Sequence, residues 1–209
     1  MNLENAFEFA VEKGYINIVE YLISNGANIH KNIYIIGVAA YNGHFDVVKI
    51  LVKNGINIHA GYGCALRNAS EAGHLPIVKF LAENTDKSID KIDDKKIKKM
   101  SLDMAAKNGN IDIVKYFVEE IGIESDDSLI LAADHGHYKI VKYLVQKGAD
   151  VHASKDSAII FASSNGHTKI VKFLTKKGIN IHAYNDCAIR WAALNGHTDI
   201  VDFLNQVVN

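Results

Sequence analysis

The feature that most constrains the fold is a unit that recurs along the whole chain of 209 residues. Each copy has a glycine, often followed by histidine, and then Ile or Val, Val, a charged residue, an aromatic residue or Ile, and Leu. The glycines are Gly14, Gly43, Gly73, Gly109, Gly136, Gly166 and Gly196, at spacings of 29, 30, 36, 27, 30 and 30 residues. Such a period is typical of repeat proteins, in which each copy contacts only its neighbours.

Each copy has the pattern of two helices. After Gly166, apolar residues follow at Ile170, Val171, Phe173 and Leu174, which is a wide stripe on a helix and excludes a strand. We expect this helix to open at residues such as Asp46, Thr168 and Thr198. A second glycine closes it in four copies, at Gly26, Gly55, Gly148 and Gly178. The preceding helix is short and carries an Ala-Ala pair, which lets two helix backbones approach closely.

Composition narrows the function. The formal net charge of −1 gives no global field for nucleic acid or an anionic membrane, and no apolar run approaches the roughly 20 residues of a membrane span. The first residues do not have the pattern of a secretory signal. Cys64 and Cys187 cannot form a disulfide framework, so we expect a reducing, cytoplasmic location.

Two segments resemble ankyrin repeats. Residues 148–153, Gly-Ala-Asp-Val-His-Ala, are similar to the family's "GADVNA" finger, and residues 195–197, Asn-Gly-His, are similar to its "NGH" turn. The resemblance implies an all-α ankyrin-repeat solenoid of seven helix-turn-helix units in one domain, 1–209. The approximate units are 1–31, 32–61, 62–92, 93–124, 125–154, 155–184 and 185–209.

The chain also departs from the family pattern. Residues 184–190 replace the usual "DxxGxTPLH" hairpin without Thr-Pro or glycine, so we expect the finger to be shortened to a tight turn. The trimmed finger, the Ile-His in place of Val-Asn, and the abundant Asn, Ile and Lys resemble ankyrin proteins of amoeba-infecting giant DNA viruses. That resemblance implies the host cell cytoplasm as the location.

The centre of the chain is irregular. The insertion 85–99 alternates Asp and Lys, which is typical of a solvated surface. Ile89, Ile92 and Ile97 favour a helix, namely an extended first helix of the fourth unit capped near Asp93 or Asp94. We expect weaker amide-exchange protection near 85–99 if this region is a hinge.

The ten histidines suggest metal binding, but their positions disfavour it. Five follow the anchoring glycines (His44, His74, His137, His167 and His197), and four lie in the fingers (His30, His59, His152 and His182). A zinc site needs four ligands around one point, whereas equivalent positions on packed repeats form a ladder with rungs roughly 10 Å apart. We therefore expect the imidazoles in both positions to bond turn carbonyls of a neighbouring repeat, and we assign no metal.

Other chemistry finds no support in the sequence. Neither cysteine has a His partner with a third orienting residue, and phosphate-binding or zinc-protease motifs are absent, so we assign no catalytic residue and no cofactor. Cys64 has the character of a buried small hydrophobe. A lysine column (Lys49, Lys79, Lys115, Lys142 and Lys172) has no interleaved stacking aromatics, so we expect a solvated ridge rather than a nucleic-acid site.

The family resemblance implies a partner protein on the concave face made by the fingers and short helices. Tyr and Arg are favoured interface anchors because they bury a large area and keep a polar group. The candidate partner-binding residues are Tyr41, Asn42, Tyr62, Arg67, Glu71, Tyr184, Asn185, Arg190 and Leu194. Trp191 shares a column with Phe9, Val38, Met104, Leu131 and Phe161, which predicts packing between repeats.

Two further expectations concern single sites and the ends. The family resemblance of residues 144–152 implies possible hydroxylation of His152 by a cellular asparagine hydroxylase. The alternative function is a structural or assembly protein that self-associates through its end repeats, where Leu3 and Val207 lack a neighbouring repeat. On the main hypothesis the chain is a non-catalytic scaffold, monomeric or weakly self-associating.

Overall fold

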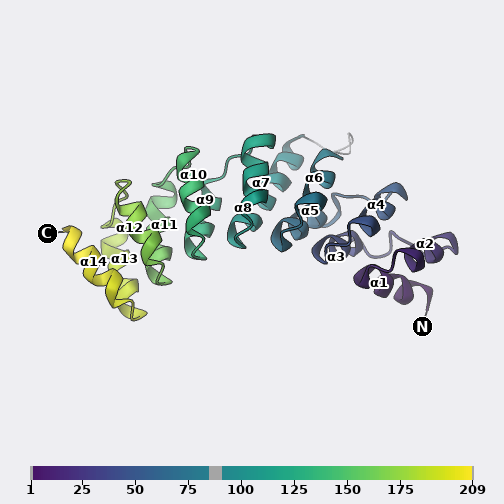
Figure 1. The fold of residues 1–209 in the computed structure, drawn as a ribbon, viewed down its shortest axis with the longest axis horizontal. Helices are drawn as coiled ribbons and strands as arrows, with labels where there is room; N and C mark the ends of the chain where they lie inside the picture. Colours follow the sequence, from purple (N-terminus) through teal and green to yellow (C-terminus); the bar gives the residue numbers. More distant parts are fainter. Residues whose placement is uncertain (1, 85–90, 209) are drawn as a thin grey trace. The chain divides into compact units, whose positions relative to one another are not determined.

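The computed structural model describes residues 2–84 and 91–208, and the side chains of all of these except 91–93 and 208. These residues form helices and turns, and none of them lies in a strand (Figure 1). The first helices of the pairs are α1 (Leu3–Lys13), α3 (Ile35–Tyr41), α5 (Ala60–Ala72), α7 (Lys91–Lys107), α9 (Asp126–Asp134), α11 (Ala153–Ser164) and α13 (Ala183–Leu194). The second helices are α2 (Ile16–Ser24), α4 (Phe45–Lys53), α6 (Leu75–Glu83), α8 (Ile111–Lys115) continued by the π-helix η1 (Tyr116–Ile121), α10 (Tyr138–Gln146), α12 (Thr168–Thr175) and α14 (Thr198–Val208).

The helix pairs form two compact units. Unit 1 consists of residues 1–105 with 115–123, and unit 2 of residues 106–114 with 124–209. In unit 1, α1, α3 and α5 pack in succession, as do α2, α4 and α6. In unit 2, α9, α11 and α13 form one layer, and α10, α12 and α14 form the other. Each unit thus has the two-layer stack that the glycine period predicts.

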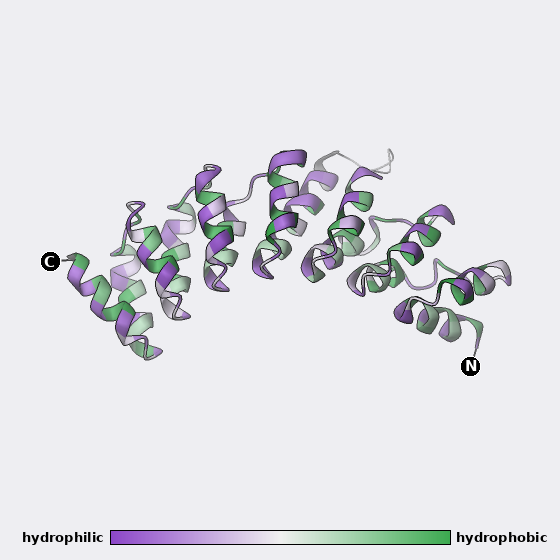
Figure 2. Cartoon of the chain, viewed as in Figure 1, coloured by the Kyte–Doolittle hydropathy of each residue, from purple (hydrophilic) through white to green (hydrophobic). Residues whose placement is uncertain are grey.

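The core lies between the two layers, where the second helices turn their apolar stripe inward (Figure 2). In α12, Ile170, Val171 and Leu174 are fully buried. The facing first helix contributes alanines, such as Ala162, because a small side chain lets the helices approach. Burying one Val, Leu or Ile contributes about 1.5–3 kcal/mol, so these repeated contacts supply most of the stabilisation.

The helix ends differ in part from the sequence-based expectation. The residue before α4 and α12 is histidine, His44 and His167, with no side-chain capping bond, so Asp46 and Thr168 are not the capping residues. Asp46 and Thr168 lie inside the first turn because the chain enters the helix directly from the Gly-His pair. The second glycines, such as Gly148 at φ 96°, adopt the left-handed conformation expected after a helix end.

The fourth first helix is extended, as expected, and is 17 residues long. It begins at Lys91, so the predicted cap at Asp93 or Asp94 is wrong, and Asp94 instead forms an ion pair with Lys98 one turn later, at 2.8 Å. The length is explained by Ile97, which is buried against Gly63 of the preceding pair. The hinge predicted for 85–99 falls partly on residues 85–90, which lie outside the described residues.

Candidate functional site

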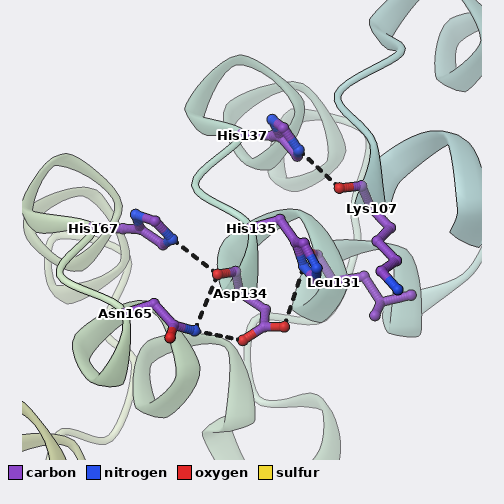
Figure 3. A network of polar contacts seen from close by, with 7 residues as sticks. All are labelled: Lys107, Leu131, Asp134, His135, His137, Asn165 and His167. Atoms are coloured by element: carbon purple, nitrogen blue, oxygen red, sulfur yellow. Dashed lines mark hydrogen bonds and ion pairs between the residues drawn. The ribbon is translucent and has the colours of Figure 1, made fainter. Parts of the chain in front are cut away.

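The histidines that follow the anchoring glycines join successive repeats. In each of the five, Nε2 donates a hydrogen bond to a main-chain carbonyl of the preceding repeat, and the bonds are 2.8–3.0 Å long. The acceptor always lies two residues before the preceding glycine, as in Lys107 for His137 and Asp134 for His167 (Figure 3). The expectation that the imidazoles bond carbonyls of a neighbouring repeat is confirmed for these five. It is wrong for the finger histidines His152 and His182, because Nδ1 of each bonds a carboxylate four residues further along its own repeat.

The same imidazoles lie against the glycines. A Cβ atom added to Gly136 would lie 2.7 Å from Cε1 of His167, and Gly136 has a φ of 79°. A side chain at this position would therefore meet both the ring and an unfavourable left-handed backbone. Each anchoring glycine and the histidine of the next repeat that packs on it form what we call a joint between repeats. The imidazole Nε2 of each joint is engaged in a structural hydrogen bond.

The fingers end in a short left-handed turn. Three consecutive residues have positive φ in three fingers, at 61–63, 154–156 and 184–186. In each, the amide of the third residue donates to the carbonyl of a finger histidine, as in Asp156 to His152 at 3.2 Å. Non-glycine residues lose about 1–2 kcal/mol each in this conformation, so the turn needs support from its surroundings.

Asp156 provides part of that support. Its Oδ1 accepts from Nδ1 of His152 at 2.7 Å and from the main-chain amide of Asn180 in the next finger at 3.1 Å. Asp126 accepts from the amide of Asp150 in the same way, at 3.1 Å. These carboxylates hold successive fingers of unit 2 in register.

The structure gives the two candidate arginines a role that the sequence did not reveal. Nη2 of Arg67 donates to the carbonyl of Gly61 at 3.1 Å, and Nη1 of Arg190 donates to the carbonyl of Asn185 at 3.3 Å. Both guanidinium groups fold back onto the left-handed turn of their own repeat. The sequence carries no signal of these contacts, because each acceptor is a main-chain carbonyl that the turn brings within reach.

The other candidate residues lie on the surface of the first helices and their turns, which we call the first-helix surface. In unit 1, Tyr62 is 82% exposed and Tyr41 is also exposed, while Glu71 is half-buried. Asn42 donates to the carbonyl of Val38 within its own helix, at 3.0 Å. In unit 2, Leu194 is 82% exposed, and Tyr184, next to Asn185, has the ammonium of Lys155 5.5 Å from its ring centroid.

The packing role expected for the Trp191 column is wrong at several positions. Trp191 is 44% exposed and Phe161 is 38% exposed, and Phe9 is exposed as well. Ala192 takes the fully buried position of α13, and Trp191 lies about 100° away around the helix axis. The column therefore belongs to the first-helix surface, where α11 and α13 are neighbours.

The comparison with protein families decides the relationship. A model described as "Ankyrin repeats (3 copies)" matches residues 7–93, 89–155 and 129–207. The chain belongs to the ankyrin repeat family. Ankyrin repeats are generally protein–protein interaction modules and typically non-enzymatic scaffolds.

A solved structure supports the ankyrin repeat fold. The crystal structure of the human ASB11 ankyrin repeat domain matches with a TM-score of 0.70 and 19% sequence identity, over 87% of this chain and 95% of that chain. At this identity the match shows the fold alone. A search of curated proteins finds no significant match.

The remaining side chains offer little chemistry. Within residues 2–84 and 91–208, no group of three or more His, Cys, Asp or Glu residues is placed to hold a metal ion. Burial raises the pKa of the Cys64 thiol, and a thiol of this kind is a poor nucleophile because little of it is thiolate. The other cysteine, Cys187, is half-buried. No helix in the described part of the chain is both long and apolar enough to cross a membrane.

Proposed function

We propose that this ankyrin repeat protein is a non-catalytic scaffold that binds a partner protein through its first-helix surface. The observation that carries the proposal is the exposure of large apolar side chains on the neighbouring helices α11 and α13. These side chains are Phe161, Tyr184, Trp191 and Leu194. Contiguous exposed apolar patches mark interaction sites more often than inert surface.

The chemistry of this patch suits a protein interface. Trp and Tyr are enriched among residues that dominate binding energy, because they bury a large area with few rotatable bonds. The ammonium of Lys155 lies over the ring of Tyr184, and Arg190 bonds the carbonyl of the next residue, Asn185, so both supply polar groups of the kind found at the rim of such interfaces. In unit 1, Phe9, Tyr41 and Tyr62 offer a second set of exposed aromatic side chains on this surface.

The test is capture of a partner from cell lysate with two matched variants. Changing Trp191 and Leu194 to Ser removes the centre of the patch, and we expect loss of the captured protein. Changing Ile18 and Tyr21 to Ser removes comparable exposed apolar area from α2, a second helix, and should leave capture unchanged. Loss with the α2 variant alone would contradict the proposal.

The resemblance to ankyrin proteins of giant viruses leads us to propose a host protein as the partner and the host cytoplasm as the location. A lysate from an amoebal host should then yield a captured protein that is released from the Trp191/Leu194 variant. Capture that depends on the patch only in lysates from unrelated cells would contradict this origin.

A second candidate function is assembly through the end repeats. Tyr15, Ile16 and Ile18 are exposed at the start of α2 and line a shallow pocket with Asn17. Light scattering over a range of concentrations separates the two functions. A constant monomer mass favours the scaffold, and a concentration-dependent mass that Ile18→Glu abolishes favours assembly.

We also propose that His152 can be hydroxylated, since its side chain lies in the finger and is half exposed to solvent. Its Nδ1 is engaged by Asp156, which leaves the rest of the ring accessible. Protein from its natural cell should then carry a mass increase of one oxygen atom that disappears in His152→Ala.

A further inference from the structure

The second helices of unit 2 carry an unusual concentration of positive charge. Residues 136–149 and 166–179 contain seven lysines and no Asp, Glu or Arg. The lysines are Lys139, Lys142 and Lys147 on and just after α10, and Lys169, Lys172, Lys176 and Lys177 on and just after α12. Because the whole chain has a net charge of −1, the rest of it carries −1 − 7 = −8.

These lysines share one surface, which we call the lysine patch. All seven are exposed, while Ile140, Val141 and Leu144 hold the opposite side of α10 in the core. The helices α10 and α12 are neighbours, and the rings of Tyr138 and Phe173 meet edge to face between them, with centroids 5.8 Å apart. Two rows of ammonium groups therefore lie on adjacent helices, about 8–10 Å apart by helix packing.

The charge is not explained by stabilisation of the helices. Lys139 and Lys142 are three residues apart, as are Lys169 and Lys172, and like charges at this spacing disfavour a helix. In unit 1 the equivalent helices balance their charge: Lys49 pairs with Asp46 at 2.6 Å, and Lys79 pairs with Glu120 at 3.0 Å. Among the described residues, no carboxylate forms an ion pair with Lys139, Lys142, Lys169 or Lys172.

The residue types of the lysine patch indicate which class of negatively charged ligand it suits. None of the exposed large apolar side chains lies on α10 or α12. The rings of Tyr143 and Phe173 are half-buried, with the ammonium groups of Lys147 and Lys177 5.6 and 5.7 Å from their centroids. These helices therefore lack the exposed rings that stack on bases and the exposed apolar side chains that insert into lipid. The patch also has no arginine for bidentate phosphate contacts. It extends about 12 Å along the helices, and the next helix, α14, carries Asp199 and Asp202 without a basic residue. A long duplex or a membrane surface would meet this negative surrounding, whereas a short segment would not.

We propose that the lysine patch binds a short acidic polypeptide segment of a partner protein. Its ammonium groups are point charges on flexible stems, which pair with carboxylates without a fixed geometry. The patch lies on the second helices and is separate from the first-helix surface, so it adds a second docking surface to the proposed scaffold. The two surfaces recognise different chemistry: apolar side chains on one, carboxylates on the other.

The test uses the full chain and a fluorescein-labelled peptide of about eight glutamates, with an all-glutamine peptide as the neutral probe. Fluorescence anisotropy at low salt should show binding of the glutamate peptide alone. Raising the salt to roughly 0.3 M, where the Debye length is only about 6 Å, should weaken it strongly. The patch variant changes Lys139, Lys142, Lys169 and Lys172 to Gln.

The control variant changes Lys31, Lys53, Lys95 and Lys96 to Gln, so that both variants have a net charge of −1 − 4 = −5. We expect the patch variant to lose at least about tenfold in affinity and the control about twofold or less. The Trp191/Leu194 variant should bind the glutamate peptide as wild type does, whatever becomes of the first-helix surface.

Three outcomes would overturn the proposal. Equal losses in the two lysine variants would show a general charge effect. No binding of the glutamate peptide at low salt would show a solvated ridge. Tighter, patch-dependent binding of duplex DNA of about ten base pairs or of phosphatidylserine vesicles would assign the patch to phosphate-bearing ligands. Circular dichroism of each variant confirms that the helices are retained.

Discussion

The imidazole of His167 lies against Gly136 of the preceding repeat while its Nε2 donates to the carbonyl of Asp134, at 2.8 Å. One side chain therefore satisfies a turn carbonyl and fills the space above a glycine. His197 holds the same relationship to Gly166 and Ser164, and His137 holds it to Gly109 and Lys107. The joint between repeats depends on the glycine as much as on the histidine.

Gly136→Ala tests this joint against Gly148→Ala. Both glycines have positive φ, but an added Cβ at Gly148 meets nothing within 4 Å. We expect Gly148→Ala to lose about 1–2 kcal/mol of unfolding free energy from backbone strain. Gly136→Ala should lose roughly 1–3 kcal/mol more, because the methyl group displaces the ring. Urea denaturation measures the free energy of unfolding of both variants. Equal losses would show that the contact between the added methyl group and the ring does not matter for stability.

His137→Ala should cost about 1–2 kcal/mol of unfolding free energy, since the Lys107 carbonyl loses its donor from the next repeat. The control is His135→Ala, two residues away, whose Nδ1 contacts Leu131 and Asp134 of its own helix (Figure 3). That change should cost less than about 0.5 kcal/mol. A larger loss of unfolding free energy for His135→Ala than for His137→Ala would contradict the role of His137 in joining two repeats.

Asp156→Ala should destabilise the protein by about 1–3 kcal/mol, because the buried carboxylate serves both His152 and the amide of Asn180. Asp186 occupies the same place in the last finger, bonds His182, and is half exposed. Asp186→Ala should therefore cost under about 1 kcal/mol. Thermal unfolding followed by circular dichroism ranks the stability of the two variants. A larger loss for Asp186→Ala than for Asp156→Ala would contradict the role of Asp156 in holding successive fingers together.

The two cysteines should react at different rates with a thiol reagent under native conditions. Burial raises the pKa of Cys64, so a smaller fraction is thiolate at about pH 8, and the buried sulfur is also less accessible. Half-buried Cys187 should supply the faster phase. Cys187→Ser should abolish that phase, whereas a fast phase that survives in this variant would contradict the burial of Cys64.

The sequence predicts the helix pairs well because they follow from periodic apolar residues and recurring glycines. The bonds of the turn histidines were also predictable, since a residue repeated in every joint must contact its neighbour. The packing predicted for Trp191 is wrong because its column holds apolar residues at most repeats, while Ala192, next to it, is the residue that reaches the core. A list of residue types does not show which of two adjacent columns faces inward.

The left-handed turns and the arginine contacts lay beyond sequence reasoning for a different reason. Residues 154–156, Ser-Lys-Asp, have no glycine to indicate positive φ, and the contacts of Asp156 that help to hold the turn form only in the folded chain. Arg67 and Arg190 have the side chain of an interface anchor, but their acceptors exist only once the turn has formed. Their role depends on backbone geometry that the residue type does not encode.

Because the same glycine–histidine joint recurs between repeats, the chain can gain or lose a whole repeat and keep matched joints. Removing residues 137–166, one full spacing, would place His167 directly after Gly136 and so opposite Gly109, which already receives a histidine of the same kind. Duplicating residues 137–166 would likewise place a histidine directly after Gly166, so the new joint would again pair a histidine with the glycine of the preceding repeat. Unequal crossing-over can therefore add or delete whole repeats without leaving a mismatched junction, and each event lengthens or shortens the exposed faces by one row of side chains.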